Sequence, residues 1–385
     1  MDTQTRQTFV RSLLKWYDAN RRDLPWRPPA GTGTGERPDP WAVLVSEAML
    51  QQTQVATVIP YFHRFLATFP TPAALAEADE QHVLRLWQGL GYYRRARNLQ
   101  AAARAIVQRH GGQVPADHAA LLALPGVGPY TAGAVASIAF DIPAPIVDGN
   151  VARVLSRLCL IETPPEAAGT KRRLWDLAEA VLPAERPGAL NSAMMELGAT
   201  LCTPKNPQCL ICPVADVCRA REAGRQTQIP TPKKARATPL HERLVLVLVR
   251  GESVLIEQRP STGRWAGLWQ FPTVEALSDV SVEEGKKTLA RLLPPSPVGR
   301  PARMPAAAWH ALPAVRHALT HRRYVFHPFL VRLPEGDDIA EDLAGAMNAR
   351  AWVALSDLDA YPLSRPQLLI ARQAKQATDF ATHQA

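Results

Sequence analysis

The feature that most constrains this chain is a run of four cysteines, Cys202, Cys209, Cys212 and Cys218, with the spacing C-x6-C-x2-C-x5-C. The run uses four of the five cysteines in 385 residues. Four thiols so close along a chain predict a metal or cluster site around which the loop must fold. The fifth cysteine, Cys159, lies in an apolar helical pattern and is expected in the core.

Three kinds of site fit such a run. Disulfides are disfavoured, because no secretory signal is found at the start and the rest of the chain is nearly free of cysteine, as in cytosolic proteins. Structural zinc sites usually pair two short C-x2-4-C knuckles, whereas only Cys209 and Cys212 form one here. The loop sizes suit four thiolates around a [4Fe-4S] cluster. We therefore expect that cluster, with zinc as the alternative.

Composition indicates a multidomain protein with a polyanionic partner. Hydrophobic residues make up 46% of the chain, yet no apolar run approaches the roughly 20 residues that span a bilayer. The length predicts two or three domains. A net charge of +9 and a pI near 9.6 favour a nucleic-acid partner, although charge alone is weak evidence. We expect a soluble protein with no membrane association.

Apolar spacing divides the chain in two. Residues 1–221 repeat apolar side chains at helical intervals, as in Trp41-Leu44-Val45-Ala48-Met49, and predict an all-α region. Residues 222–240 are polar, basic and proline-rich, and predict a linker. Residues 241–370 predict an α+β domain, and 371–385 a C-terminal tail. In this second half we expect strands over 244–250, 253–258, 324–331 and 351–354, a hairpin turn at Gly251-Glu252, and a helix over 282–293.

A glycine turn lies in Leu124-Pro-Gly-Val-Gly-Pro-Tyr-Thr-Ala132, between two helical patterns over residues 116–140. Gly126 and Gly128 allow a tight turn and leave backbone N–H groups bare at a helix N-terminus. Such a terminus attracts phosphate through its donors and its dipole. The segment predicts a helix-hairpin-helix that binds the DNA backbone, with an ordinary turn as the alternative.

Two acidic residues occupy positions that suit a catalytic role. Asp148 precedes a helical pattern, where an N-cap contributes about 1 kcal/mol. Glu47 has Val43 and Leu50 as its i−4 and i+3 neighbours, so apolar groups face one side of its carboxylate. Partial desolvation would raise its pKa toward neutrality, as a general acid requires. The plainer alternatives are a simple cap for Asp148 and an exposed surface position for Glu47.

Together the hairpin, the aspartate some twenty residues later and the cysteine run resemble the endonuclease III superfamily of DNA glycosylases. The segments SEAMLQQTQV, LGYYRRARNL, LPGVGPYTAGAVASIAF and VDGNVARV most resemble its adenine-specific branch, the MutY family. The resemblance runs from about residue 6 to 221 and continues in a Nudix-like domain containing Gly267-Leu-Trp-Gln-Phe-Pro272. It implies an all-α helix-hairpin-helix glycosylase with a [4Fe-4S] loop at 202–218, plus a C-terminal α+β Nudix-like domain that recognises 8-oxoguanine.

The resemblance implies a monofunctional glycosylase of base excision repair that flips adenine out of the duplex and hydrolyses its N-glycosidic bond. Glu47 would protonate adenine at N7, and Asp148 would stabilise the oxocarbenium ion or add covalently to C1′. Tyr130 would orient the carboxylates, and Asn150 would hold a polar network near the sugar. Bifunctional relatives have a Schiff-base lysine where this chain has Tyr130.

Further DNA contacts follow from the same resemblance. The residues around the base opposite the adenine would be Gln52, Thr53, Leu90 and Tyr92. Arg27 would lie near the adenine pocket, beside an apparent insertion over residues 28–36.

In the second domain, a loop that senses 8-oxoguanine is matched by Leu319-Thr320-His321, where leucine and threonine replace the usual phenylalanine and serine. The hydroxyl of Thr320 is kept, and His321 follows it as in the family. The magnesium-binding Nudix motif is reduced to Val282-Glu-Glu-Gly285, so a binding domain without hydrolase activity is expected.

Two alternative functions differ in class. A bifunctional endonuclease III-like glycosylase/lyase for oxidised pyrimidines is opposed by Tyr130 and Glu47. A noncatalytic redox sensor that binds DNA would make both carboxylates dispensable. The expected partner is double-stranded DNA with A opposite 8-oxoguanine or G, bound by a monomer in the bacterial cytoplasm at the nucleoid.

Overall fold

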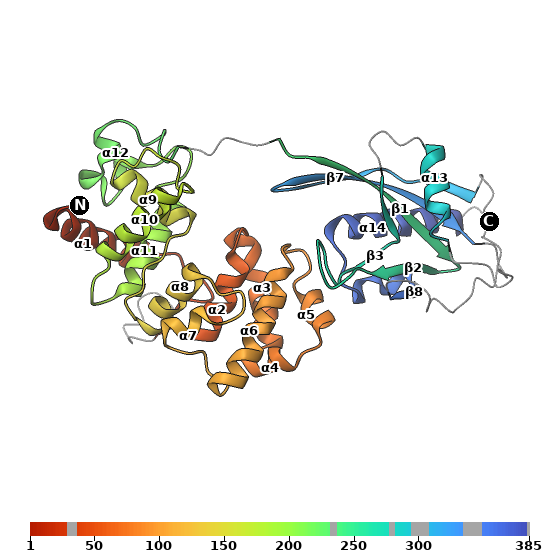
Figure 1. Cartoon of the computed structure of the whole chain (residues 1–385), viewed down its shortest axis with the longest axis horizontal. Helices are drawn as coiled ribbons and strands as arrows, with labels where there is room; N and C mark the ends of the chain where they lie inside the picture. Colours follow the sequence, from red (N-terminus) through yellow and green to blue (C-terminus); the bar gives the residue numbers. More distant parts are fainter. Residues whose placement is uncertain (29–36, 232–236, 277–281, 294–307, 334–348, 383–385) are drawn as a thin grey trace. The chain divides into compact units, whose positions relative to one another are not determined.

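The computed structural model describes residues 1–28, 37–231, 237–276, 282–293, 308–333 and 349–382. The chain forms two compact units, which are coloured along the sequence in Figure 1. Unit 1 contains Met1–Ala78 and Arg94–Ala235, and unit 2 contains Asp79–Tyr93 and Arg236–Ala385. The apparent insertion after Arg27 lies almost wholly outside the described residues.

Unit 1 is helical, and no strand occurs in its described part. This confirms the all-α prediction from apolar spacing. Its elements are α1 (Thr3–Asn20), α2 (Pro40–Leu50), α3 (Val55–Thr68), α4 (Pro72–Glu77), α6 (Arg94–His110), α7 (His118–Leu122), α8 (Pro129–Phe140), α9 (Gly149–Leu158), α10 (Ala168–Val181), α11 (Pro187–Thr200), the 3-10 helices η1 (Cys209–Ile211) and η2 (Ala215–Val217), and α12 (Arg219–Glu222).

Short polar side chains begin several of these helices. Asp39 accepts hydrogen bonds from two backbone N–H groups at the start of α2, and Asp117 accepts one at the start of α7. Asp148 caps α9 in the same way, which confirms the N-cap prediction. Each such cap stabilises its helix by about 1 kcal/mol. Helix α8 begins differently, because its N-cap Gly128 offers no side-chain acceptor.

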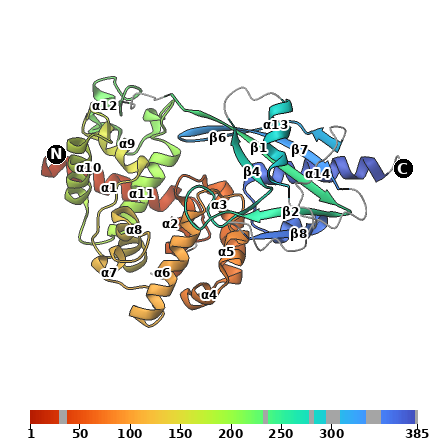
Figure 2. The same cartoon turned by 45° about the vertical axis from the view of Figure 1, so that its right-hand side comes forward.

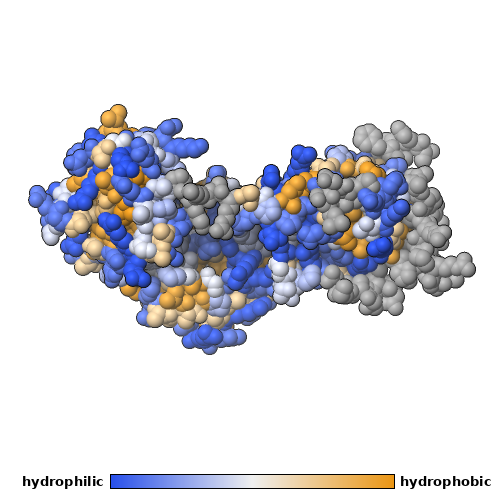
Figure 3. Space-filling model, turned by 45° about the horizontal axis from the view of Figure 1, so that its top comes forward, coloured by the Kyte–Doolittle hydropathy of each residue, from blue (hydrophilic) through white to orange (hydrophobic). Residues whose placement is uncertain are grey.

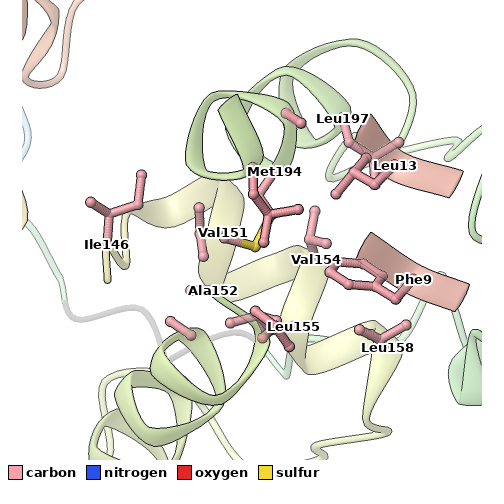
Figure 4. Packing of buried hydrophobic residues seen from close by; sticks show 14 of the residues in the cluster. Phe9, Leu13, Ile146, Val151, Ala152, Val154, Leu155, Leu158, Met194 and Leu197 are labelled. Carbon is pink, nitrogen blue, oxygen red and sulfur yellow. The ribbon is translucent and has the colours of Figure 1, made fainter. Parts of the chain in front are cut away.

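Helix α9 is held in place by the hydrophobic core of unit 1. Its residues Val151 to Leu158 are all buried. Figure 4 shows Phe9 and Leu13 of α1, together with Met194 and Leu197 of α11, packed against them. Full burial of a large apolar side chain contributes about 1.5–3 kcal/mol, so this packing fixes the position of α9. Its N-terminal turn, which carries Asp148 and Asn150, is fixed with it.

Unit 2 contains one mixed sheet, helices α5 (Glu80–Leu86), α13 (Val282–Ala290) and α14 (Arg365–Thr382), and the 3-10 helix η4 (Leu355–Ala360). This confirms the expected α+β class of the second half. The strands are β1 (Leu240–Arg250), β2 (Ser253–Gln258), β3 (Trp269–Gln270), β4 (Thr273–Ala276), β5 (Trp309–Ala311), β6 (Val315–Leu319), β7 (Arg322–Arg332) and β8 (Arg350–Ala354).

The sheet runs in the order β3-β2-β1-β7-β5, with β4, β6 and β8 paired alongside. Strands β1 and β7 are parallel, and the other pairs are antiparallel. Alternate residues of β1 enter two cores, one with Leu289 of α13 and one with Ile370 of α14. The two helices therefore cover opposite faces of the sheet, as the view in Figure 2 also indicates. The hairpin at Gly251-Glu252 is confirmed, because Arg250 pairs with Ser253.

The surface seen in Figure 3 is mostly hydrophilic, with scattered apolar patches. Among the exposed apolar side chains are Leu210 and Ile211, which lie between two of the clustered cysteines. No helix in the described ranges is long and apolar enough to cross a membrane.

Helices α8 and α11 make a contact that only glycine permits. A Cβ added at Gly188 would lie 2.1 Å from the carbonyl oxygen of Ser137, and backbone cannot yield as a flexible side chain can. We expect Gly188→Ala to lower the free energy of unfolding by about 1–3 kcal/mol, measured by urea or thermal denaturation. Gly169→Ala in α10 is the control, since nothing lies within 4 Å of its added methyl group. Equal losses in the two variants would contradict this account.

Candidate active site and cluster site

A cleft of about 550 Å³ opens in unit 1. Parts of α2, α8, α9 and α11 line it, together with the segment that follows α1. Seven residues that the sequence analysis selected lie on its wall, contributed by segments far apart in the chain. They are Arg27, Glu47, Gln52, Thr53, Tyr130, Asp148 and Asn150.

Glu47 is a buried acid on the wall of this cleft, and its expected role as proton donor stays a prediction. Its side chain sits on α2 and the residue is only 5% exposed. Burial raises the pKa of Glu47 from 4.5 to about 7, and the negative charge of Asp148 raises it further. Tyr130 and Arg27 act in the opposite direction. The desolvation predicted from Val43 and Leu50 is confirmed, and the exposed-surface alternative is wrong.

Asp148 serves as a cap and faces the cleft at the same time. Its Oδ1 accepts the backbone N–H of Val151 at 2.7 Å, and its Oδ2 accepts Asn150 Nδ2 at 3.0 Å. Burial raises the pKa of Asp148, while these hydrogen bonds and Arg153 partly offset the rise. The carboxylate is therefore held in one orientation at the cleft wall.

Asn150 connects this carboxylate to a buried arginine. Its Oδ1 accepts Arg153 Nη2 at 2.8 Å. The same guanidinium donates to the carbonyl oxygens of Gly198 and Cys202, each at 2.7 Å. The start of α9, the end of α11 and the cysteine loop thus share one hydrogen-bonded junction. Asn150 therefore belongs to a polar network, and its expected place near the sugar stays a prediction.

Tyr130 lies in the first turn of α8 and donates its hydroxyl proton to Met195 Sδ at 3.3 Å. Burial raises the pKa of Tyr130 well above its ordinary value, and the carboxylates of Glu47 and Asp148 add to the rise. The residue is therefore a neutral phenol at physiological pH. Its expected role in orienting the two carboxylates stays a prediction.

Glu196 is a cleft residue that the sequence analysis missed. It lies on α11 with 1% exposure and accepts Arg22 Nε at 2.5 Å and Arg27 Nη1 at 3.0 Å. Burial pushes its pKa upward, but the two guanidinium groups prevail and the net pKa is lowered. An acidic residue between Met195 and Leu197, within an apolar helical run, was the available sign in the sequence.

The predicted helix-hairpin-helix consists of α7, a turn and α8. Gly126 needs its glycine, because its φ is +75° and an added Cβ would lie 2.4 Å from Asn98 Cβ. Gly128 adopts an ordinary φ of −96°, so the turn itself does not require glycine there. As an N-cap without a side chain, Gly128 leaves the N-terminus of α8 open to an anion. DNA binding by this turn stays a prediction.

Predicted contacts of the opposite base also occur in unit 2. Tyr92 is 46% exposed, and its Oη lies 2.7 Å from Oγ1 of Thr320. Thr320 and His321 are exposed at the turn between β6 and β7. Leu90 is buried, with 6% exposure. The structure therefore brings Tyr92 to the recognition loop expected from the sequence, although the two are 228 positions apart.

The four cysteines of the run line one cavity in unit 1, together with apolar side chains such as Leu197 and Val214. In the part of the chain that is described, no three His, Cys, Asp or Glu side chains are placed to hold a single metal ion. In a four-iron cluster each thiolate binds a separate iron, so four cysteines on the wall of one cavity match the number of ligands that it needs. Burial raises the pKa of Cys212 to about 12, and cationic iron favours the thiolate that such a site needs.

Family comparisons agree with these sites. Residues 45–180 match the HhH-GPD superfamily of base excision DNA repair proteins, 202–218 match the iron-sulfur binding domain of endonuclease III, and 244–373 match the NUDIX domain. A solved thermostable thymine-DNA glycosylase superposes with a TM-score of 0.50 and 29% identity, covering 57% of this chain and 98% of that one. Fold and site therefore define a DNA glycosylase of base excision repair with an iron-sulfur loop and a Nudix domain.

Comparison with relatives of named activity identifies one family within this class of DNA glycosylases. The rat adenine DNA glycosylase is 39% identical over 382 residues, covering 88% of this chain and 73% of the rat protein. The human adenine DNA glycosylase is 42% identical over 312 residues, but only 57% of its length is covered. The chain belongs to the adenine DNA glycosylase family. The chain carries a [4Fe-4S] cluster, and the matched iron-sulfur binding domain spans all four cysteines of the run, which are its expected ligands.

The two buried glutamates of the cleft predict opposite effects on stability. A carboxyl whose pKa rises on folding stabilises the fold below its unfolded pKa and loses this effect as the pH rises through the folded value. The pKa of Glu47 rises on folding from 4.5 to about 7. This shift corresponds to about 3 kcal/mol of the free energy of unfolding, all of it lost by pH 8. Glu47→Gln should therefore raise the melting temperature at pH 8, with a smaller gain at pH 5. Glu196→Gln is the matched control. It should lower the melting temperature, since two arginines lose their partner. Shifts of the same sign in both variants would refute this assignment.

Proposed function

We propose that the chain is a monofunctional adenine DNA glycosylase that hydrolyses the N-glycosidic bond of adenine opposite 8-oxoguanine or guanine in double-stranded DNA. One observation carries the proposal. A buried glutamic acid with a pKa of about 7 shares a cleft of about 550 Å³ with a fixed aspartate. A cleft of that size accommodates a flipped base, and the two carboxyl groups supply the acid and the anion that the reaction needs.

The reaction follows from the charges that bond cleavage creates. Adenine is first flipped from the stack, because its glycosidic bond is shielded inside the duplex. Glu47 gives its proton to N7, so the base leaves as a neutral molecule. Positive charge then develops on the sugar, and Asp148 stabilises it or forms a bond to C1′ that water later displaces. Water supplies the new hydroxyl group, and its proton restores Glu47.

Selectivity for adenine is supported by the polar end of the cleft. Glu196 stays ionised between Arg22 and Arg27, and its remaining lone pairs suit the exocyclic amine of adenine. The two guanidinium groups supply donors for ring nitrogens. Trp26 is buried at the same wall and contacts Phe62 edge to face, which fixes an aromatic surface beside the base.

The monofunctional assignment rests on the nucleophiles available. Tyr130 occupies the position of the lysine in bifunctional relatives, and no lysine lines the cleft in the described part of the chain. A Schiff base to C1′ needs an amine. The endonuclease III-like glycosylase/lyase is therefore disfavoured. Strand cleavage should require added alkali.

The second domain is proposed to read the base opposite the adenine. Tyr92, in hydrogen-bond contact with Thr320, supports a shared recognition surface at the β6–β7 turn, with His321 beside it. We assign catalysis to residues 1–221 and recognition to the domain that begins at residue 241, joined by 222–240. Helix α14 (Arg365–Thr382) belongs to that domain, because Ala371 and Ala374 lie in its core, so most of the expected tail 371–385 is part of the fold. The protein acts as a monomer on chromosomal DNA at the bacterial nucleoid.

Single-turnover release of adenine tests the proposal directly. The wild-type chain should release adenine from duplexes with A opposite 8-oxoguanine and A opposite G, and alkali should then reveal the abasic site. Glu47→Gln should lower the rate by about 10²–10⁴, the usual contribution of general acid catalysis. Alkali-independent cleavage at thymine glycol would instead support the lyase. Tight DNA binding without release from any duplex would favour a noncatalytic function.

The pH dependence of the same rate gives a separate prediction. Only protonated Glu47 can act as the acid, so the rate should fall above about pH 7, by about tenfold per unit once the carboxyl is mostly ionised. Single-turnover rates between pH 5 and 9 would show the inflection. A flat profile up to pH 9 would contradict the role of Glu47.

A further inference from the structure

A buried arginine outside the reacting groups binds the end of the helix that carries Glu47. Arg95, in the first turn of α6, is 8% exposed. Its Nη1 donates to the carbonyl oxygens of Ala48 at 3.0 Å, Met49 at 2.7 Å and Gln51 at 2.7 Å. Its Nη2 donates to Thr53 Oγ1 at 3.2 Å. One side chain of α6 thus joins the last turn of α2 to the segment that follows.

The end of α2 needs such a partner. The last carbonyl groups of a helix have no intrahelical donors and carry the negative end of the helix dipole. Helix α2 has no basic residue in its own last turn. Arg95 supplies donors and positive charge from another helix, and its planar guanidinium fixes the direction of each bond.

The segment after α2 is a constrained turn. Gln52 has a φ of +58°, a left-handed conformation that glutamine rarely adopts. Such a backbone persists only when its surroundings hold it. Arg95 binds the residue on either side, Gln51 and Thr53. Gln52 and Thr53 line the same cleft as Glu47.

We propose that Arg95 is a positioning residue that sets the Gln52–Thr53 turn against the base opposite the adenine. The proposal rests on the function proposed above and on the expectation from the sequence that Gln52 and Thr53 contact the base opposite the adenine. Arg95 does not touch the reacting groups and is not among the groups that shift the pKa of Glu47. Its loss should therefore alter recognition of the opposite base and leave the ionisation of the acid unchanged.

Arg95→Met tests the proposal, because it keeps most of the side-chain bulk and removes every donor. Hydrogen exchange of the peptide covering residues 50–54 should accelerate by roughly tenfold, as the turn loses its hydrogen bonds. Discrimination between the two duplexes should fall: the ratio of single-turnover rates for A opposite 8-oxoguanine and A opposite G should come closer to one by roughly tenfold. The inflection near pH 7 should stay in place. Arg95→Lys keeps the positive charge but lacks the planar guanidinium with its several N–H donors. It should restore the ratio of the two rates only in part.

Arg104→Met is the matched control, since Arg104 is an exposed arginine of the same helix that donates to the carbonyl oxygen of Ala76 at 3.1 Å. It should change neither readout. Unaltered exchange over 50–54 in Arg95→Met would overturn the proposal, as would an equal loss of rate on both duplexes. If the wild-type chain released no adenine, the proposed function would fail, and the exchange measurement alone would still decide the role of Arg95.

Discussion

The position of the first turn of α9 is the constraint on which the site depends. Asp148 must close a helix end and face the cleft, and both tasks require the same orientation of its carboxylate. The hydrophobic core fixes the helix behind it, while Asn150 and Arg153 fix the turn from the side. On the proposed mechanism, a carboxylate held in this way stabilises developing positive charge without having to reorient during the reaction.

Two glutamates in one cleft show how partners determine chemistry. Glu47 and Glu196 are both buried, with 5% and 1% exposure. Glu196 has two arginines beside it and remains an anion, whereas burial keeps a proton on Glu47 up to about pH 7. The same type of side chain therefore stays ionised in one place and is protonated up to about pH 7 in the other. Burial alone does not set the charge, because the net pKa depends on which charges accompany it.

Local sequence patterns predicted the features that depend on near neighbours. The cysteine spacing, the cap at Asp148 and the apolar neighbours of Glu47 all act within a few residues, and each is present. Glu196 and Arg95 were missed because their partners lie far away in the chain, where spacing gives no information. The short strands β3, β4, β5 and β6 were missed for a related reason. Pairing with longer strands, and not their own composition, makes them strands.

On the proposed mechanism, the free protein favours the protonated form of the acid before any substrate binds. Glu47 carries a raised pKa before any base enters, because protein groups alone remove it from water. A flipped adenine would exclude more water, and added desolvation of a carboxyl favours its neutral form still further. Entry of the base would therefore favour the protonated acid. At neutral pH, where a group with a pKa of about 7 is only partly protonated, it would also draw a proton from solvent. Burial raises the pKa of Asp148 as well, but its two hydrogen bonds favour the anion and partly offset the rise. On the proposed mechanism, one cleft thus places two carboxyl groups in different roles, one as the acid and one as the stabiliser of positive charge.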